Sequence, residues 1–570
     1  MHDLLIRNGR IVDGSGGAPY EADIAVSGGR IAAIGRDLGP ARRSIDAAGR
    51  LVLPGWVDIH THYDGQATWD AELAPSSWHG VTTAVFGNCG VGFAPLRPGT
   101  APYLINLMEG VEDIPGTVLA QGIDFRWESF PEYLDALAAT PRSMDIAAQV
   151  PHGALRFYVM GERGADHTER PDAAEVATMG RLLEDALRAG AFGLSTSRTT
   201  KHRAADGRPT PSLSADEPEL HGLALALARA GRGVLQVNSD FGPGEFEILR
   251  DAAALAGRPL SVLLLQTDHQ PDLWRQTLAQ IHAARRDGIA VNGQIGSRPI
   301  GLVMGLETSM HPLASRPAWR EIADLPPAER VARLRTDAAL RERLIHEPPV
   351  LDGIVAQMIE RALPKTFRLA DPVNYEPHPD DALVAQAARR GVPPLALALD
   401  WMLEDDGHGL LLYPFENYHA GNLDAVREML LDDATVCGLS DGGAHVGLIC
   451  DASSPTTLLT HWARDRQRGP GLPLELLVKK QTRDTALAYG LADRGLLAPG
   501  LRADINVVDF ERLRVRRPQV VYDLPAGGKR VLQRADGYDH TFVAGVETFC
   551  GGEPTGARPG QLLRGAPQVA

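Results

Sequence analysis

Hydrophobic and polar positions follow two different periods along the chain. Toward both ends they alternate every second residue in short runs broken by glycine-rich turns, at residues 3–35, 44–55, 503–516 and 538–553. A period of two is typical of strands with one buried face. Because the two ends share this alternating pattern, we expect them to form one small β-domain together, a β-sandwich.

The middle of the chain follows a helical period instead. Amphipathic stretches at residues 173–190, 217–233, 245–259 and 273–288 are each followed by a short apolar run. Helix followed by strand, repeated, is the pattern of a parallel α/β fold. The sequence therefore predicts a (β/α)8 TIM-like barrel, of the α/β class.

These patterns set the expected domain boundaries. We expect the barrel over residues 55–490, which leaves residues 1–54 and 491–570 for the two parts of the β-sandwich and a tail. A less regular stretch at about 302–345 is interpreted as an insertion into the barrel. Catalytic residues of such barrels lie at the C-terminal ends of the strands, where several apolar runs here end in polar groups.

Composition and charge narrow the class of protein. The chain has 570 residues, of which 44% are hydrophobic and 23% charged, values typical of a soluble globular protein. A net charge of -15 argues against nucleic acid or an anionic membrane surface as partner. Four cysteines without a CxxC pair are no disulfide framework. With no signal-peptide pattern and no apolar run of membrane-spanning length, we expect a cytoplasmic protein.

The apolar run "RLVLPGWVDI" leads directly into His60-Thr61-His62. Alternate residues of a strand point to the same side, so the two imidazoles should face one direction. A hydrogen-bonded pair of surface histidines is the plainer interpretation. The position after a buried strand favours metal ligation over it.

Cys89 in "FGNCGVG" and Asp441 in "GLSDGGAH" each end a further apolar stretch. A free cysteine is most often a small buried hydrophobic residue, and an aspartate before two glycines is often a turn residue. Beside two histidines, however, a thiolate is a natural ligand for zinc. We expect Asp441 to be a ligand, a general base or both.

Four other residues are candidates for contacting a substrate. Arg198 and Arg298 carry planar guanidinium groups that match a carboxylate, although a salt bridge within the fold explains each equally well. His445 follows Asp441 by four residues and could support a ligand, touch substrate or be structural. His152, like His202, lies near another apparent strand end.

The motifs, in their order along the chain, resemble those of one family. The segments "GRIVDGSG", "PGWVDIHTHYD", "GVTTAVFGNCGVGFAP", "GAFGLSTSR", "LSDGGAH" and "ADRGLLAPGLRADINVVDF" resemble the N-acyl-D-amino-acid deacylases (D-aminoacylases) of the amidohydrolase superfamily. The resemblance spans almost the whole chain. It implies a barrel with a small β-sandwich, and a metal set of His60, His62 and Asp441. It also implies that Cys89 is a bridging or second-site ligand in place of a carboxylated lysine; the chain has five lysines and none before Lys201.

Three positions depart from the family pattern. Asn238 and Leu264 stand where the family has histidines, and Gln266 lies near the position of its carboxylate-binding lysine. His202 and His269 are the histidines that could replace them. We therefore expect one zinc ion, with a second left open.

Together these residues predict a metal-dependent hydrolase that deacylates an N-acyl-(D-)amino acid or a similar small N-acyl amine. The metal would activate water, and Asp441 would take its proton and pass it to the leaving amine. The same machinery could instead cleave a cyclic amide, a carbamoyl compound or a lactone. A non-catalytic barrel acting as a binding or assembly subunit is the alternative of another class. The oligomeric state is open, with a homo-oligomer as one option.

Overall fold

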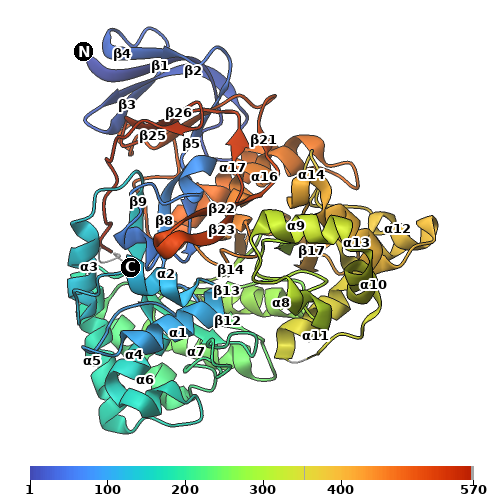
Figure 1. Ribbon diagram of the computed structural model, residues 1–570. Coiled ribbons are helices and arrows are strands. Elements are labelled where there is room, and N and C mark those ends of the chain that lie inside the picture. The colour runs from blue at the N-terminus through green and yellow to red at the C-terminus, as the bar shows by residue number, and fades with distance from the viewer. Residues whose placement is uncertain (352, 566–570) are drawn as a thin grey trace.

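The computed structural model describes residues 1–351 and 353–565, and it has a mixed α/β fold (Figure 1). The expected alternation of helix and strand in the middle of the chain is confirmed. It runs through α5 (Ala173–Ala189), β11 (Gly193–Arg198), α6 (Glu217–Ala230), β12 (Val234–Ser239), α7 (Glu245–Ala256), β13 (Leu260–Leu263), α8 (Leu273–Arg286) and β14 (Val291–Gln294).

Local sequence signals explain where these helices begin and end. The Asp172 side chain accepts hydrogen bonds from the backbone N–H groups of Ala174 and Glu175 at the start of α5, in a capping box with Glu175. Gly190 ends the same helix in the left-handed conformation, at φ 119°. Each helix thus stops just before the next strand begins.

The strands that reach the candidate site pair in parallel. One six-stranded sheet has the order β10-β11-β12-β13-β14-β18, a three-stranded sheet has the order β6-β8-β9, and β19 pairs with β7. The additional strands are β6 (Trp56–Asp58), β7 (His60–Thr61), β8 (Val81–Phe86), β9 (Asp145–Ala148), β10 (Val150–Pro151), β18 (Thr435–Val436) and β19 (Leu439–Gly442). Parallel pairing brings their C-terminal ends to one side of the molecule.

Both ends of the chain contribute to a single nine-stranded sheet, seen at the top of Figure 1. Its N-terminal strands are β1 (His2–Ile11), β2 (Tyr20–Ser27), β3 (Arg30–Gly35), β4 (Ala41–Asp46) and β5 (Leu51–Pro54). Its C-terminal strands are β20 (Ile505–Val508), β25 (Tyr538–Val543), β26 (Val546–Cys550) and β27 (Glu553–Pro554). The two groups meet where β20 pairs antiparallel with β5, and Ile6, Val52, Ile505 and Phe542 share a separate apolar cluster beneath the sheet.

A further lobe lies between β14 and β18, on the right of Figure 1. It contains a three-stranded antiparallel sheet of β15 (Ile300–Met304), β17 (Leu411–Glu416) and β16 (Phe367–Arg368). Its main helices are α9 (Pro327–Thr336), α10 (Ala338–His346), α11 (Gly353–Ala362), α12 (Leu383–Arg390) and α13 (Pro394–Met402). The lobe has its own apolar cluster, and the irregular stretch 302–345 lies within it.

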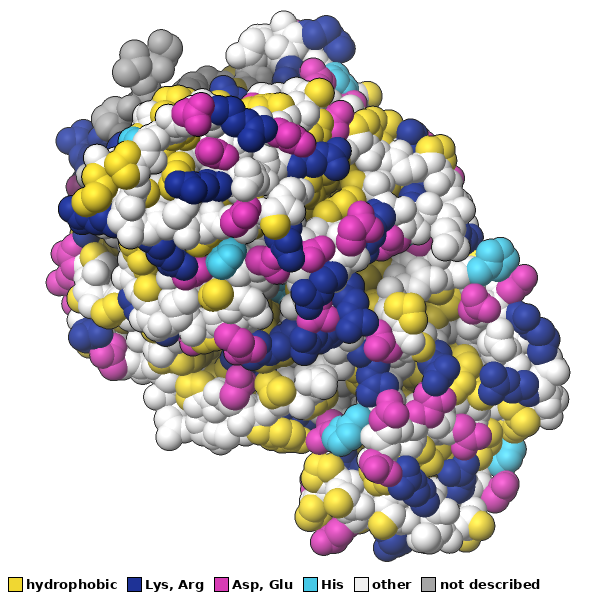
Figure 2. Space-filling view, turned by 90° about the horizontal axis from the view of Figure 1, so that it is seen from above, with side chains coloured by type: hydrophobic (Ala, Val, Ile, Leu, Met, Phe, Trp, Pro, Cys, Tyr) yellow, Lys and Arg dark blue, Asp and Glu magenta, His cyan; other side chains and the backbone are white. Residues whose placement is uncertain are grey.

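The surface carries both signs of charge. On the face in Figure 2 acidic and basic side chains are interspersed, with one gathering of basic side chains near the middle of the view. None of the helices in the described part of the chain combines the length and hydropathy needed to cross a membrane.

Candidate metal centre

His60 and His62 lie at the end of a short buried strand, β7, and face each other. Their ring centroids are 5.4 Å apart, and neither residue is more than 1% exposed. The His62 backbone N–H donates to the Gly442 carbonyl over 2.7 Å, which fixes β7 against β19. Backbone pairing with β19 therefore holds the HxH pair in place.

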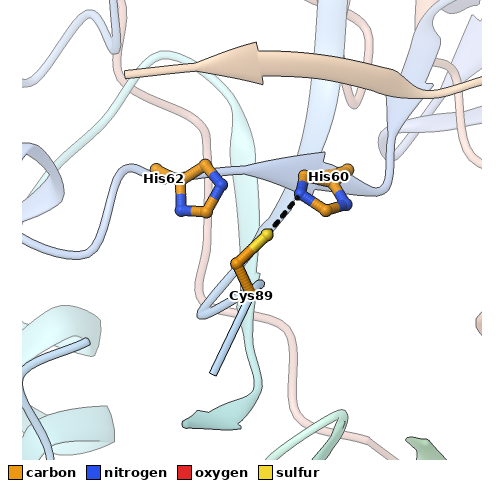
Figure 3. Close-up of side chains that lie close together, drawn as sticks. All are labelled: His60, His62 and Cys89. Carbon is orange, nitrogen blue, oxygen red and sulfur yellow. Dashed lines mark hydrogen bonds between the residues drawn. The ribbon is translucent and has the colours of Figure 1, made fainter. Parts of the chain in front are cut away.

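Cys89 points its sulfur at this pair, as Figure 3 shows. Its Sγ lies 3.3 Å from His60 Nε2, and the donor atoms of the three residues all lie within 4.8 Å of one another. The residue follows β8 in the left-handed region, at φ 54°. The neighbouring Asn88 amide holds this turn in place by donating to the carbonyls of Thr61 and Val85 at 3.1 and 3.0 Å.

Asp441 completes the group from β19. Its Oδ1 lies 3.4 Å from His60 Nε2 and 3.6 Å from His62 Nε2. The pairing of β19 with β7 shifts register between Leu439 and Gly442, and Asp441 itself has φ 48°. This irregularity turns the carboxylate out of the ladder and toward the histidines.

Two side chains that the sequence analysis did not single out orient the rings. Gln294 Oε1, at the end of β14, is 2.8 Å from His60 Nδ1, and Glu112 Oε1, at the end of α1 (Ala101–Glu112), is 3.3 Å from His62 Nδ1. An amide oxygen can only accept, so His60 Nδ1 carries the proton and Nε2 presents its lone pair to the cluster. Such outer partners fix histidine ligands in metalloproteins.

The electrostatics of the cluster follow from its burial. Burial lowers the pKa of His60 to about 4 and raises the pKa of the Cys89 thiol to about 11. Burial also opposes protonation of His62, but the carboxylates of Glu112 and Asp441 outweigh it and hold the pKa of His62 well above its usual value. The two histidines in turn hold the pKa of Asp441 far below its usual value, against the effect of burial.

Of the two histidines considered as replacements, His202 lies beside the cluster. Its Nδ1 is 2.9 Å from Ser197 Oγ, and its Nε2 is 3.2 Å from the amide nitrogen of Asn238. The same Asn238 nitrogen is 3.8 Å from Cys89 Sγ. Burial, with the nearby charges of His445 and His62, lowers the pKa of His202 to about 3. His269 is exposed, and Leu264 packs in the main apolar cluster.

The structure places the remaining candidates in other contacts. Arg198 forms an ion pair with Glu245, and Arg298 is buried against Asp451 at 2.7 Å. Both ring nitrogens of the buried His152 are bonded, to Thr196 Oγ1 and Glu219 Oε1 at 2.9 Å each. His445 alone stays at the cluster, with Nε2 3.5 Å from Glu112 Oε2.

A mixed α/β fold with nitrogen, sulfur and carboxylate donors gathered at strand ends is typical of metal-dependent hydrolases. Residues 43–553 match the Amidohydrolase family, and the chain belongs to this family. It is thus an enzyme that hydrolyses carbon–nitrogen bonds other than peptide bonds.

Relatives with known activities agree with this membership. An N-acyl-D-glutamate deacylase of Alcaligenes xylosoxydans xylosoxydans is 29% identical over 585 residues, which cover 100% of this chain and 98% of the relative. A solved D-aminoacylase structure is 25% identical, with a TM-score of 0.65 over 99% of this chain and 100% of that one, and it is described with a binuclear metal centre. The N-acyl-D-glutamate deacylase of Bordetella bronchiseptica, solved with zinc and a phosphonate inhibitor, is 26% identical with a TM-score of 0.63 over 99% of each chain. The predicted resemblance to the D-aminoacylase family is confirmed.

Proposed function

We propose that the chain deacylates small N-acyl amines, with N-acyl-D-amino acids as the reference class, at the cluster of His60, His62, Cys89 and Asp441. The observation that carries this proposal is the state of His62. Its ring is buried between two carboxylates, with Nδ1 3.3 Å from Glu112 Oε1 and Nε2 3.6 Å from Asp441 Oδ1, and neither contact is a well-formed hydrogen bond. The carboxylates favour positive charge at this ring, and a bound cation would take the place of the proton on the nitrogen that faces Asp441.

The donor set of the cluster fits zinc, which prefers nitrogen and sulfur ligands with a carboxylate. We assign His60 Nε2, His62 Nε2, Cys89 Sγ and an Asp441 oxygen as the groups that would hold it. When bound, zinc would supply Lewis-acid polarisation of the acyl carbonyl and a lowered pKa for water.

One zinc ion, rather than two, is the number we propose. The Asn238 amide nitrogen lies within reach of both Cys89 Sγ and His202 Nε2, at 3.8 and 3.2 Å. An amide N–H donor at this point can satisfy the lone pairs that a second cation would otherwise use. The apolar side chain of Leu264 offers no ligand nearby.

Asp441 is the proposed general base and acid. Its depressed pKa keeps the carboxylate ionised at neutral pH, so that it can accept a proton from the attacking water. The carboxylic acid formed in this way would then donate the proton to the leaving amine. His445, which shares the Glu112 carboxylate with His62, is the candidate for contacting the developing oxyanion.

For Arg198, Arg298 and His152 we now favour structural roles, because each is already committed to a partner inside the fold. Hydrolysis of a cyclic amide, a carbamoyl compound or a lactone is the second candidate function. The same observation favours it, because neither arginine is free to bind the carboxylate of an amino acid.

We also propose that the parallel ladders form one closed (β/α)8 barrel over residues 55–490. The three parallel ladders are linked by strands that follow one another almost directly along the chain, which supports a single continuous sheet. One or two residues separate the strands in each of the pairs β6 and β7, β9 and β10, and β18 and β19. Residues 1–54 and 491–570 would then supply the two parts of the β-sandwich and a tail, with the lobe between β14 and β18 as the insertion.

Metal content and activity test the proposal together. Elemental analysis should give about one zinc per chain, and the His60→Ala/His62→Ala variant should lose both the metal and the hydrolysis of a panel of N-acyl-D- and N-acyl-L-amino acids and their carboxamides. His346→Ala, at an exposed histidine, is the matched control and should keep both. Full activity of metal-free protein would contradict the proposal.

A further inference from the structure

A cavity of about 350 Å³ opens beside the cluster, at the C-terminal ends of β12 and β13. Asn238 lines the cavity, and its amide nitrogen is 3.8 Å from Cys89 Sγ. His202, which contacts the same amide, adjoins the lining residues Thr200 and Lys201. A group held in this cavity therefore lies next to the proposed reaction centre.

Large apolar side chains form one part of the cavity wall, beside polar residues such as Thr200, Ser239 and Thr267. The large apolar side chains that line it are Phe241, Leu263, Leu264, Leu265, Leu273 and Trp274. Leu264 and Trp274 are almost fully buried, at 1% and 2% exposed, so they belong to the packed core behind this part of the wall. Such a wall favours an apolar group over a solvated one.

The charges around the cavity oppose an anion. Lys201 is the one lysine or arginine among the lining residues, and its Nζ is paired with Glu416, whose side chain is 8% exposed. Asp240 lies on the same wall. The two carboxylates outnumber the single ammonium, so the field at the cavity is acidic.

Neighbouring cations do not change this balance. Lys365 pairs with both oxygens of Asp268, at 2.7 and 2.9 Å, and Arg198 pairs with Glu245. A substrate carboxylate in the cavity would compete with Glu416 for Lys201 and weaken the ion pair of that nearly buried carboxylate. The Lys201 side chain is 45% exposed, so the cost is smaller than for a fully buried pair, but it still disfavours the anion.

We propose that this cavity binds an uncharged, apolar group of the substrate, and that the substrate bears no free carboxylate there. The substrate class is then a neutral N-acyl amine, including the carboxamide of an N-acyl amino acid, rather than the free acid. This inference rests on the proposed amide hydrolysis and narrows its substrate. The proposed substrate class differs from those of the related deacylases, whose names give acidic amino acids or D-amino acids as substrates.

Matched substrate pairs test the inference. For the zinc-loaded protein, kcat/KM should be about tenfold or more higher for an N-acyl amino acid carboxamide than for its free acid, with the acyl group and stereochemistry held constant. Equal rates, or a preference for the acid, would overturn the inference while leaving the hydrolase function intact. If neither is cleaved, the proposed function fails, and calorimetric binding of the same pair still decides whether the cavity rejects the carboxylate.

A variant isolates the ion pair itself. Glu416→Gln should release Lys201 and shift the ratio of kcat/KM values toward the free acid by about tenfold, through a lower KM for the acid. Glu428→Gln, which removes an exposed partner of Arg275, is the matched control and should leave the ratio unchanged. A ratio that stays the same in Glu416→Gln would overturn the role assigned to the pair.

Discussion

At the scale of single residues, Asp441 is the residue whose substitution should affect the catalytic rate most directly. Its carboxylate faces both histidines, and the proposed mechanism asks it to carry one proton. Asp441→Asn is nearly isosteric but cannot accept that proton, so kcat at saturating zinc should fall by about 10²- to 10⁴-fold while the variant still folds. Because Asp441 is also a proposed zinc ligand, the zinc content is measured alongside. Steady-state kinetics on a confirmed substrate measure the first effect, and a wild-type rate would contradict the assignment.

Asn238 offers a test of metal number. Asn238→Asp exchanges a hydrogen-bond donor for an anionic oxygen beside Cys89 Sγ and His202 Nε2, which creates a nitrogen, sulfur and oxygen donor set. The variant should bind about two zinc ions per chain where the wild type binds about one. Elemental analysis and the absorption spectrum of the cobalt-substituted protein report the change.

The control for this experiment is Asn422→Asp, on the loop before α15 (Asp424–Leu431), which should keep the wild-type stoichiometry. If the wild-type protein already binds two zinc ions, the Asn238 amide does not block a second site, and the proposal of a single ion is wrong.

The cluster residues differ in how far the sequence reveals them. His60, His62, Cys89 and Asp441 each end an apolar run, so a local pattern marks them as neighbours at strand ends. Glu112 carries no such mark, because it is one more acidic residue at the end of an amphipathic helix. Its contact with His62 arises from the packing of α1 against the strand ends, which no local spacing encodes.

At the scale of elements, a buried ion-pair network joins β9 to the segment that enters the terminal sheet. Asp145 on β9 is fully buried and pairs with Arg494 at 2.7 Å and Arg502 at 2.9 Å. Asp145→Ala should lower the free energy of unfolding by about 2–3 kcal/mol, because both guanidinium groups lose their bonds to this carboxylate, although Asp504 still pairs with both of them.

Denaturant unfolding measures this loss. The matched control is Arg36→Ala, which removes an ion pair whose two side chains are 57% and 80% exposed, and which should cost no more than about 1 kcal/mol. Equal losses in the two variants would show that the Asp145 network does not join the elements.

Sequence periodicity predicts elements well where they are long and amphipathic. Helices α5 to α8 and the strands after them lie where the period places them. The lobe between β14 and β18 is different, because its strands pair antiparallel across a long separation in the sequence, as β15 and β16 do with β17. A two-residue strand such as β16 contains too few positions to show a period.

At the scale of the whole molecule, buried neutral histidines couple stability to pH. Burial lowers the pKa of His79 to about 4 and that of His311 to about 3, from an ordinary value of 6.5. Between pH 6.5 and about 4 the unfolded chain therefore binds protons that the folded chain excludes. Stability is fully present above pH 6.5 and falls as the pH drops, by about 1.4 kcal/mol per pH unit for each histidine.

His79→Gln isolates one of these contributions. His79 bridges Thr456 Oγ1 and the Gln533 carbonyl, at 2.8 Å each, and neither partner is one of the proposed zinc ligands. The variant should lose stability at neutral pH, and its free energy of unfolding should depend less steeply on pH than the wild type's, by about 1.4 kcal/mol per unit between pH 6 and 4.5. Denaturant unfolding of the zinc-loaded proteins at several pH values measures both slopes, and contributions from the cluster cancel in the comparison. A loss of stability that is the same at every pH would contradict the prediction, because it would mean that His79 contributes packing and hydrogen bonds but no proton linkage.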